Sequence, residues 1–517
     1  MPITPPDVVA AETLPRWLYQ LAERYGDAEA LVEPAGEART FGELGRRVTA
    51  LSQTLAEAGV RRGGRVAYLL PNSAFIIEQF LAATRLGAVS LGINTRSRLH
   101  DLRTVLRRAQ PGHLIAARSF LSIDFEAMIS EALDGLEHRP AVLWSDRLDR
   151  VPRRDPGLPD CAQASDLAVA FMTSGTTGTP KLPAHTHQHV VAHLRAAGKA
   201  ARVDRGATSL LVLPFCGTFG FVSAMSTLSG GGRVVLPPRF TPASAAELID
   251  RFGVTHVNGS DDMLIAIIEQ GGKLTSWRYG VQAEFTGHGE RAVAAAEERG
   301  ARIAGVYGSS ETFALLTMRE PEEPLEQRSP PGGVFVAQDM EVRIAEANDS
   351  TGPSVAVGEI QFRGPSVADA YLQADGTIPP ALTDEGWFST GDLGYLDEDG
   401  GFTYVARKDD ALRLAGFLVD PAEIERFLER HPAVRQAQVV GAMGDDGREE
   451  AVAFVIADDT DDARLLEYCR TGLANFKVPA RIVIVEDLPA VDGANGTKLM
   501  RSTLRRVAAE LFRADPA

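Results

Sequence analysis

Cysteine is scarce in this chain. Only Cys161, Cys216 and Cys469 occur among 517 residues. Three widely spaced thiols cannot form a disulfide framework, and their spacing fits no zinc motif. The composition therefore favours a reducing compartment, and we expect a cytoplasmic protein.

An excess of basic charge is also lacking. The chain has 53 Lys and Arg against 69 Asp and Glu, which gives a net charge of −16. A nucleic-acid surface needs a net-basic face, so nucleic acid is not expected as a partner. A few lysines and backbone N–H groups can still bind the phosphates of a small ligand.

Targeting and membrane segments are not evident. Residues 1–16 carry Asp7 and Glu12 and have no basic n-region, unlike a signal peptide. The longest uncharged stretch, residues 206–232, is interrupted by Pro214 and several glycines. We interpret it as a buried strand, loop and helix, not as a membrane span.

What the chain does have is the composition of a globular protein, with 44% apolar and 24% charged residues. Strand-like and helical stretches alternate in its first half, for example a strand at 65–70 and a helix at 75–86. Alternation of this kind predicts βαβ units with largely parallel sheets. The fold class predicted is α/β.

The pattern changes after Gly358. Short strands with Gly- and Asp-rich turns are predicted at 359–364, 401–405 and 412–418, followed by a last unit with helices at 421–429, 463–474 and 501–511. We expect a boundary near residues 407–410. The predicted domains are 1–408 and 409–517.

The most informative segment is residues 173–181, which directly follow an apolar strand at 167–172. Glycines let backbone N–H groups turn inward, hydroxyls donate hydrogen bonds, and a lysine supplies a cation, so the segment is suited to a polyphosphate. The spacing is not that of a Walker A loop. The candidate phosphate-binding residues are Thr173, Ser174, Gly175, Thr176, Thr177, Gly178 and Lys181.

This loop resembles the signature of the adenylate-forming superfamily, which includes acyl- and aryl-CoA ligases, nonribosomal peptide synthetase adenylation domains and luciferases. Five further motifs follow in the family's order: 307–312 (YGSSET), 389–392 (STGD), 406–409 (ARKD), 421–425 (PAEIE) and 495–498 (NGTK). The resemblance covers nearly the whole chain. It implies a large N-terminal AMP-binding domain with βαβ-rich sheets and a small β-barrel-like part, followed by a small, mobile α+β domain that carries a catalytic lysine.

The motifs also imply roles for single residues. Tyr307 would stack on adenine, Glu311 would bind Mg²⁺, and Asp392 would accept hydrogen bonds from the ribose hydroxyls. Lys498 would stabilise the charge that develops at the α-phosphate, as part of a catalytic set with Glu311 and Lys181. The remaining nucleotide contacts implied are Gly287, Gly308, Ser310 and Arg407.

Two residues near the predicted boundary match the family's conformational machinery. Asp409 matches the hinge about which the small domain rotates between half-reactions. Gly416 resembles the glycine that lines the tunnel for the acceptor's pantetheine arm. The resemblance therefore implies a hinge mechanism in which one active-site face replaces another.

The predicted acyl pocket departs from the family pattern. Gly217 replaces a histidine in the loop that ends at Phe219 and Gly220, and polar residues (Asn258, Asp261 and His288) stand where a fatty-acid ligase is mainly apolar. Buried polar groups need partners, so a polar substrate is one explanation. A structural network, or a shift in the local alignment, is the other.

Four histidines cluster at 185, 187, 189 and 193. His189 and His193 are spaced for one helix face, as metal ligands can be, but no Glu or Cys with ligand spacing accompanies them. We interpret the cluster as the start of a helix after the phosphate loop.

These expectations converge on an ATP- and Mg²⁺-dependent acid:CoA ligase that forms an acyl-adenylate and then a thioester, with coenzyme A as the acceptor. A polar-substituted aryl acid is the expected substrate. One alternative is a same-fold enzyme with a different acceptor or anion, such as a carrier protein, an amine or nitrite. A second is a fatty acyl-CoA ligase.

Overall fold

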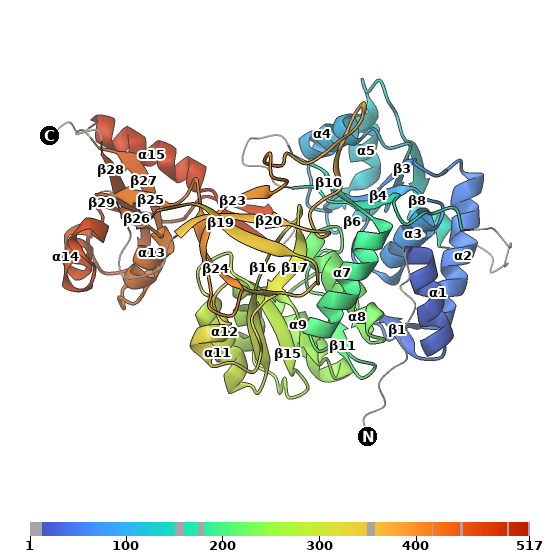
Figure 1. Cartoon of the computed structure of the whole chain (residues 1–517), viewed down its shortest axis with the longest axis horizontal. Helices are drawn as coiled ribbons and strands as arrows, with labels where there is room; N and C mark the ends of the chain where they lie inside the picture. Colours follow the sequence, from blue (N-terminus) through green and yellow to red (C-terminus); the bar gives the residue numbers. More distant parts are fainter. Residues whose placement is uncertain are drawn as a thin grey trace.

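The computed structural model describes residues 13–149, 160–173, 180–348, 357–415, 417–444, 448–493 and 496–514. It has a large N-terminal domain and a small C-terminal domain (Figure 1). The fold class is α/β, as expected. The small domain lies at one end of the molecule, next to strands β19 and β20, whose bounds are given below.

An eight-stranded sheet forms one half of the large domain. Five parallel strands continue into antiparallel ones at β9–β10. In sheet order the strands are β22 (Gly376–Ile378), β21 (Ala370–Gln373), β10 (Pro183–Thr186), β9 (Leu167–Ala170), β4 (Val89–Gly92), β3 (Arg65–Leu69), β5 (His113–Ala116) and β8 (Ala141–Trp144). The strand predicted at 65–70 is confirmed as β3.

The second sheet is longer and has two arms that meet at β16. One arm is parallel and consists of β16 (Arg302–Ser309), β15 (Tyr279–Ala283), β13 (His256–Val257), β11 (Thr208–Leu210), β12 (Arg233–Val235) and β1 (Glu29–Val32), with β2 (Ala38–Thr40) and β14 (Gly259–Ser260) beside it. The other is antiparallel: β17 (Phe313–Met318), β18 (Gly332–Phe335), β24 (Phe402–Arg407), β23 (Phe388–Leu396), β20 (Val357–Arg363) and β19 (Glu341–Asn348). The expected barrel-like part corresponds to this antiparallel arm, which is continuous with the parallel strands through β16.

Helices pack between the two sheets and on their outer faces. One buried cluster joins side chains of both sheets with α1 (Leu14–Tyr25), α2 (Phe41–Glu57), α3 (Ala74–Arg85), α7 (His187–Ala200) and α8 (Thr218–Ser229). A second cluster includes α4 (Leu99–Ala109) and α5 (Phe125–Leu133). The parallel arm is also packed by α9 (Pro242–Phe252), α10 (Asp261–Glu269) and α11 (Gly289–Glu298), and two short helices, α6 (Ser145–Leu148) and α12 (Leu325–Arg328), complete the domain.

Local sequence explains the central helices. Helix α3 begins after Ser73, whose side chain accepts the N–H of Ile76, and it ends before Gly87, whose φ of 73° suits glycine. All of its residues are buried, as expected for a helix between two sheets. The uncharged stretch at 206–232 contains β11 and the buried helix α8, as predicted. Among the helices of the described residues, none has the length and apolar character that a membrane span requires.

The small domain has a three-stranded sheet of β27 (Val434–Met443), β28 (Glu449–Ala457) and β29 (Arg481–Ile484), with helices α13 (Pro421–Glu429), α14 (Asp462–Gly472) and α15 (Arg501–Ala514). Its apolar side chains form two clusters of their own. The strand predicted at 412–418 is wrong: the segment is a hairpin of β25 (Leu412–Leu414) and β26 (Phe417–Val419), because the chain turns at Ala415, where φ is 50°. The boundary at residue 408 stays a prediction.

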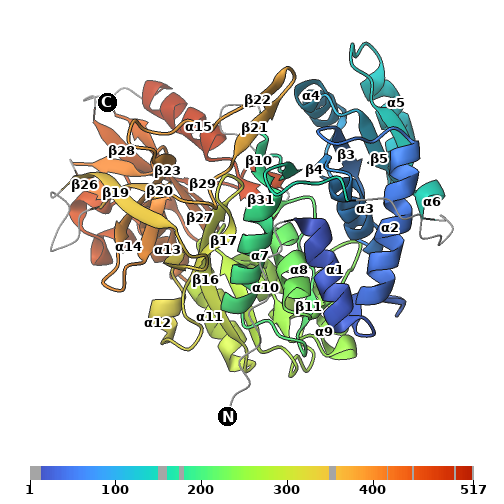
Figure 2. The ribbon, with the colours of Figure 1, turned by 45° about the vertical axis from the view of Figure 1, so that its right-hand side comes forward.

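A second hairpin carries the predicted catalytic lysine. Strand β30 (Ala490–Gly493) pairs with β31 (Gly496–Leu499), and Lys498 lies opposite Val491. In Figure 2, helices α13, α14 and α15 of the small domain lie on the opposite side of the view from α1 and α2 of the large domain. The side chain of Lys498 is outside the part of the chain that the structure describes.

Candidate active site

Hydrogen bonds join the first and last residues of the predicted phosphate loop. The backbone N–H of Thr173 donates to the carbonyl of Lys181 at 3.0 Å, and the N–H of Lys181 donates to the Thr173 hydroxyl at 3.2 Å. The two ends of the loop are therefore tied together at the edge of β9 and β10. Ser174, Gly175, Thr176, Thr177 and Gly178 lie outside the described residues.

The lysine of this loop is exposed and lies beside an aromatic ring. Its Nζ is 6.0 Å from the ring centroid of Tyr371 on β21. Burial raises the pKa of Tyr371, and the nearby negative charge of Glu311 raises it further. Glu311 and Lys181 are thus both neighbours of Tyr371, which the sequence did not single out. The structure brings two predicted catalytic residues to one place.

Three predicted nucleotide residues meet on adjacent strands. The Tyr307 hydroxyl on β16 donates to Asp392 on β23, and Arg407 on β24 is the ladder partner of Asp392. A guanidinium nitrogen of Arg407 lies 3.0 Å from Asp392 Oδ1. No described residue makes an aligned hydrogen bond to this oxygen, which is buried. A ribose hydroxyl could donate a hydrogen bond to this oxygen, so the site fits the nucleotide that the motif implies.

Burial and charge oppose one another at Asp392. Burial raises the pKa of its carboxyl group, and the positive charge of Arg407 and the hydrogen bond from Tyr307 lower it. Burial and the same carboxylate raise the pKa of Tyr307, so the phenol stays protonated and remains a donor. The Tyr307 ring is packed by Phe362 and Phe402 edge-on. The predicted stacking of Tyr307 on adenine stays a prediction.

The segment around Glu311 is held from three elements. The carbonyl of Ser310 accepts from His185 Nε2 at 2.9 Å, and its hydroxyl accepts from the Thr218 hydroxyl at 2.9 Å. The carbonyl of Glu311 accepts from the N–H of Ala368 at 2.7 Å. Gly308 has no room for a side chain, because a Cβ would lie 2.4 Å from the carbonyl oxygen of Phe313. These contacts fix the backbone from which a half-buried carboxylate projects, a suitable oxygen ligand for Mg²⁺.

Two of the clustered histidines clamp a phenylalanine that follows this segment. The ring of Phe313 lies between His185 and His193, at centroid distances of 3.8 and 4.6 Å. His193 Nε2 is 2.9 Å from the carbonyl of Ala314. Phe313 has φ of 62°, an uncommon conformation for an aromatic residue, and the clamp stabilises it. Burial lowers the pKa of both histidines to about 4, so both are neutral at pH 7.

A metal role for the histidines is not supported by their contacts. His189 pairs with Asp369 at 3.0 Å, and His187 accepts the N–H of Leu14 at 3.2 Å. Within the described residues, no group of three or more His, Cys, Asp or Glu side chains is arranged to hold a metal ion. The helix-start interpretation is confirmed for His187, the first residue of α7.

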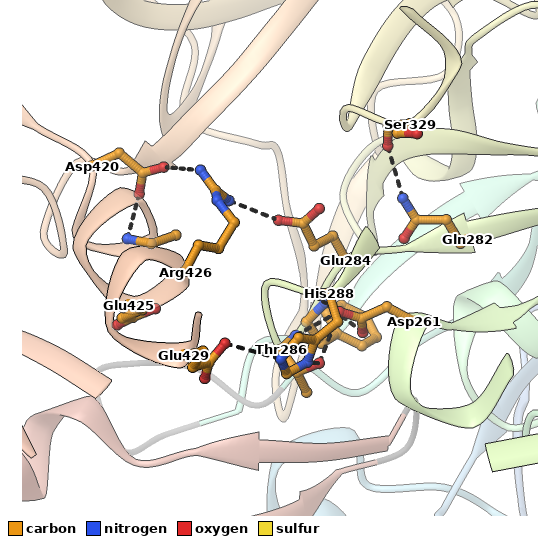
Figure 3. A network of polar contacts seen from close by, with 12 residues as sticks. Asp261, Gln282, Glu284, Thr286, His288, Ser329, Asp420, Glu425, Arg426 and Glu429 are labelled. Atoms are coloured by element: carbon orange, nitrogen blue, oxygen red, sulfur yellow. Dashed lines mark hydrogen bonds and ion pairs between the residues drawn. The ribbon is translucent and has the colours of Figure 1, made fainter. Parts of the chain in front are cut away.

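Two of the polar residues predicted for the acyl pocket, Asp261 and His288, belong to one hydrogen-bond network (Figure 3). Asp261 is fully buried, and its carboxylate accepts from the backbone N–H groups of Phe285, Thr286 and His288 and from the Thr286 hydroxyl, at 2.8–3.1 Å. Asn258 donates to the Ser223 hydroxyl and accepts from the N–H of Val281. Both side chains are thus engaged within the protein. The network alternative accounts for these bonds, and contact of either residue with the acid stays a prediction.

His288 lies in the turn that Asp261 holds. Its Nε2 is 3.1 Å from Glu429 on α13 of the small domain, and its Nδ1 is 2.9 Å from the Thr286 hydroxyl. A role for His288 in the acyl pocket stays a prediction. Gly287, in the same turn, has φ of 83°, which only glycine adopts readily. Gly217 and Phe219 stand at the start of α8, and Phe219 is buried.

The hinge and tunnel residues are placed only in part. The carbonyl of Asp409 accepts from Arg505 on α15 at 2.6 Å, and Arg505 also pairs with Asp410. The segment after β24 is thereby attached to the small domain. Gly416 lies outside the described residues.

Comparison with known proteins agrees with this arrangement. A model of the AMP-binding enzyme family matches residues 18–372, and a model of the AMP-binding enzyme C-terminal domain matches residues 423–492. The chain belongs to the AMP-binding enzyme family. The resemblance to the adenylate-forming superfamily is thereby confirmed.

Known ligases and synthetases resemble this AMP-binding enzyme along nearly its whole length. It is 31% identical over 505 residues to 2-succinylbenzoate–CoA ligase of Geobacillus kaustophilus, covering 96% of this chain and 98% of the relative. O-succinylbenzoate coenzyme A synthetase (MenE) of Bacillus subtilis, in complex with AMP, has a TM-score of 0.79 and 27% identity, covering 95% of this chain and 98% of that one. The amide bond synthetase McbA of Marinactinospora thermotolerans has a TM-score of 0.79 and 26% identity, covering 96% and 99%.

Proposed function

We propose that this enzyme is an AMP-forming acid:CoA ligase that activates an aryl acid with ATP. The observation that carries the proposal is the similarity, over almost the full length of both chains, to 2-succinylbenzoate–CoA ligase. The cluster of Tyr307, Asp392 and Arg407, with Glu311 and Lys181 nearby, supplies groups suited to ribose, Mg²⁺ and phosphate.

The first half-reaction joins the acid to the adenylyl group of ATP and releases pyrophosphate. The acid's carboxylate oxygen attacks the α-phosphorus, and Mg²⁺ neutralises the phosphate oxygens when bound. In this proposal Asp392 orients the ribose, Glu311 holds the cation, and Lys181 and Lys498 stabilise negative charge on the phosphates. The nucleotide contacts predicted at Thr173, Gly287, Gly308 and Ser310, and in the loop 174–178, belong to the same proposal.

In the second half-reaction the thiol of coenzyme A displaces AMP and forms the thioester. We assign the hinge to Asp409 and the lining of the acceptor tunnel to Gly416. The domains proposed to rotate are 1–408 and 409–517. The small domain has hydrophobic clusters of its own, which support its movement as a unit.

The class of acid is proposed on grounds separate from those for the reaction. Preference for a polar-substituted ring rested on Asn258 and Asp261, and both use their polar atoms inside the protein. The aryl class rests instead on the similarity to the succinylbenzoate ligases. Gly217 and Phe219 remain the residues that we propose to border the acid.

A different acceptor is the second candidate, favoured by the similarity to an amide bond synthetase. An amine would then attack the acyl-adenylate in place of the thiol. Transfer to a carrier protein and activation of nitrite belong to the same class of alternative. A fatty acyl-CoA ligase is the third candidate function.

One screen separates these activities. Pyrophosphate release is measured with 2-succinylbenzoate, anthranilate, benzoate, octanoate and nitrite, each with and without coenzyme A or a primary amine, and products are identified by mass spectrometry. We expect an aryl-CoA thioester that requires coenzyme A. Two results would reject the proposal. One is an amide that forms from the added amine, without coenzyme A, as fast as the thioester forms with it. The other is a higher rate with octanoate than with any of the aryl acids.

A further inference from the structure

The turn at residues 285–288 of the large domain, together with the preceding Glu284, contacts helix α13 of the small domain at two points (Figure 3). His288 Nε2 lies 3.1 Å from Glu429 Oε2, and a guanidinium nitrogen of Arg426 lies 3.8 Å from Glu284 Oε1. Each point pairs a basic group with a carboxylate. The two pairs have opposite polarity across the interface, so the contact resists sliding of α13 along the turn.

The turn itself is rigidly attached to the large domain. Asp261, at the start of α10, accepts three backbone N–H groups of the turn and the Thr286 hydroxyl. On the other side, the second oxygen of Glu429 accepts the N–H of Ala437 on β27. A continuous series of hydrogen bonds therefore runs from Asp261 through Thr286 and His288 to the sheet of the small domain.

The positions of the protons in this series can be assigned. A carboxylate oxygen 2.8 Å from the Thr286 hydroxyl can only accept, so the hydroxyl proton points to Asp261. The Thr286 oxygen must then accept a proton from His288 Nδ1, which is 2.9 Å away. A neutral ring with its proton on Nδ1 would present a lone pair to Glu429 at Nε2. The geometry is satisfied when both ring nitrogens carry protons, as in the imidazolium ion.

The charges around the ring agree with this assignment. The hydrogen bond to Glu429 is the largest cause that raises the pKa of His288, the negative charge of Asp261 adds to it, and partial burial and Arg291 oppose it. Beside it, burial raises the pKa of Glu284 to about 7, aided by the negative charges of Asp261 and Asp420 and opposed by Arg426 and His288.

We propose that His288, as the imidazolium ion, is a positioning residue that docks α13 and holds the small domain, with Lys498 on β31, in the orientation described here. The part of the proposal that concerns catalysis rests on the proposed function. Because docking raises the pKa of His288, the docked state takes up a proton. Docking is therefore complete at low pH and weakens as pH rises through the raised value.

Hydrogen–deuterium exchange of the full-length, ligand-free protein tests the docking without any assumption about activity. Exchange of residues 284–290 and 421–429 is compared at pH 6.5 and 8.5, after correction for intrinsic rates. In the wild type we expect protection of both segments to fall by about two- to fivefold at the higher pH, the size expected for a partly exposed ion pair.

Three variants separate charge from shape. In Glu429→Gln the amide oxygen can still accept from Ala437, but the charge is lost, so we expect low protection at both pH values. His288→Gln should behave in the same way. His288→Lys keeps a cation that does not titrate in this range. We expect high protection with a smaller pH dependence than in the wild type, because Glu284, whose pKa burial raises to about 7, still titrates at this interface. Arg435→Gln, which breaks an exposed ion pair within the small domain, is the matched control and should behave as the wild type.

The two half-reactions then test the consequence for catalysis. We expect Glu429→Gln to slow adenylate formation by about two- to fivefold and to consume a supplied acyl-adenylate with coenzyme A at the wild-type rate or faster. The same pH dependence of exchange in the wild type, Glu429→Gln and His288→Lys would overturn the docking. Altered exchange with unchanged adenylation would overturn the positioning role. A wild type that adenylates no acid would reject the proposed function, and the exchange data would still decide the docking.

Discussion

At the scale of single residues, Lys498 stands apart from the other proposed catalytic groups because it comes from the small domain. A compact cation that reaches the α-phosphate only in one domain orientation stabilises the transition state of one half-reaction. The other charged groups, Glu311, Asp392 and Arg407, belong to the large domain. They would contribute in both orientations.

Replacing Lys498 should therefore affect one step only. We expect Lys498→Ala to lower the rate of adenylate formation by roughly 10²–10³-fold. A supplied acyl-adenylate should still be converted to the thioester. Rapid-quench measurement of each half-reaction checks this, with Lys273→Ala, at an exposed position, as the control. Equal losses in both steps would remove the assigned role.

The buried histidines define a second property at this scale. His193 is fully buried and neutral, with its pKa lowered to about 4 by burial, whereas the unfolded chain has a value near 6.5. Between these values the unfolded state binds more protons, so the stability that His193 contributes is present above about pH 6.5 and is lost as pH falls.

His193→Gln isolates this contribution, because all other titrating groups cancel in the comparison. At pH 7.5 the variant should be less stable, since the ring stack on Phe313 is lost. At pH 5 the difference in the free energy of unfolding should shrink by about 2 kcal/mol. Guanidinium unfolding of both proteins at the two pH values measures it. A difference that stays constant with pH would show that His193 carries a proton in the folded state.

At the scale of elements, the turn between β15 and α11 is shaped by a side chain from another helix. Asp261 satisfies three N–H groups that no strand or helix bond satisfies. The carboxylate is therefore to this turn what a cap is to a helix end. It is placed by α10, of which it is the first residue.

Asp261→Asn tests this dependence. The amide can replace only one of the two accepting oxygens, so at least one buried N–H group loses its partner at a cost of about 1–3 kcal/mol. We expect a lower free energy of unfolding and faster amide exchange at residues 285–288. Asp262→Asn, at the next position and outside this network, should leave that exchange unchanged. If the two variants behave alike, the turn does not depend on Asp261.

The elements also show how far the sequence could be interpreted. Periodicity was sufficient for β3, α3 and α13, because apolar alternation and caps are local signals. The hairpin β25–β26 was not separated, because Ala415, at positive φ, is a residue type that gives no turn signal, and Gly416 beside it was interpreted as a tunnel residue.

Within the site, local motifs indicated Tyr307, Glu311, Asp392 and Arg407, which the structure brings together. Contacts between distant segments gave no such signal. The three-ring stack of His185, Phe313 and His193 and the bond from Thr218 to Ser310 each join residues more than 90 positions apart. Asp261 shows a different limit. The sequence indicated a polar residue at an unusual position, but only its hydrogen-bond partners in the folded chain show whether it binds a substrate or stabilises the turn.

At the scale of the whole molecule, the attachment of residues 409 and 410 to α15 bears on the proposed rotation. If Asp409 is the hinge, its backbone must change conformation between the half-reactions while Arg505 stays with the small domain. The described orientation is then one of two.

Restricting the hinge should separate the two steps. Asp409→Pro fixes φ at about −65°, and we expect adenylate to form and accumulate while thioester formation slows severely. Single-turnover assays with quantified acyl-adenylate check this, and Asp399→Pro, in a turn of the large domain, tests whether any nearby proline has the same effect. Unchanged overall turnover would place the hinge elsewhere.

The wide separation of the site residues along the chain has a consequence for synthesis on the ribosome. The two ends of the phosphate loop, Thr173 and Lys181, emerge early. Asp392 follows its partner Tyr307 by 85 residues, and Arg407 comes later still. A nascent chain that ends before residue 407 cannot assemble the nucleotide cluster, so ATP cannot guide its folding. Nucleotide should therefore protect the released, full-length enzyme against proteolysis, and should leave stalled chains of 390 residues as sensitive as they are without it.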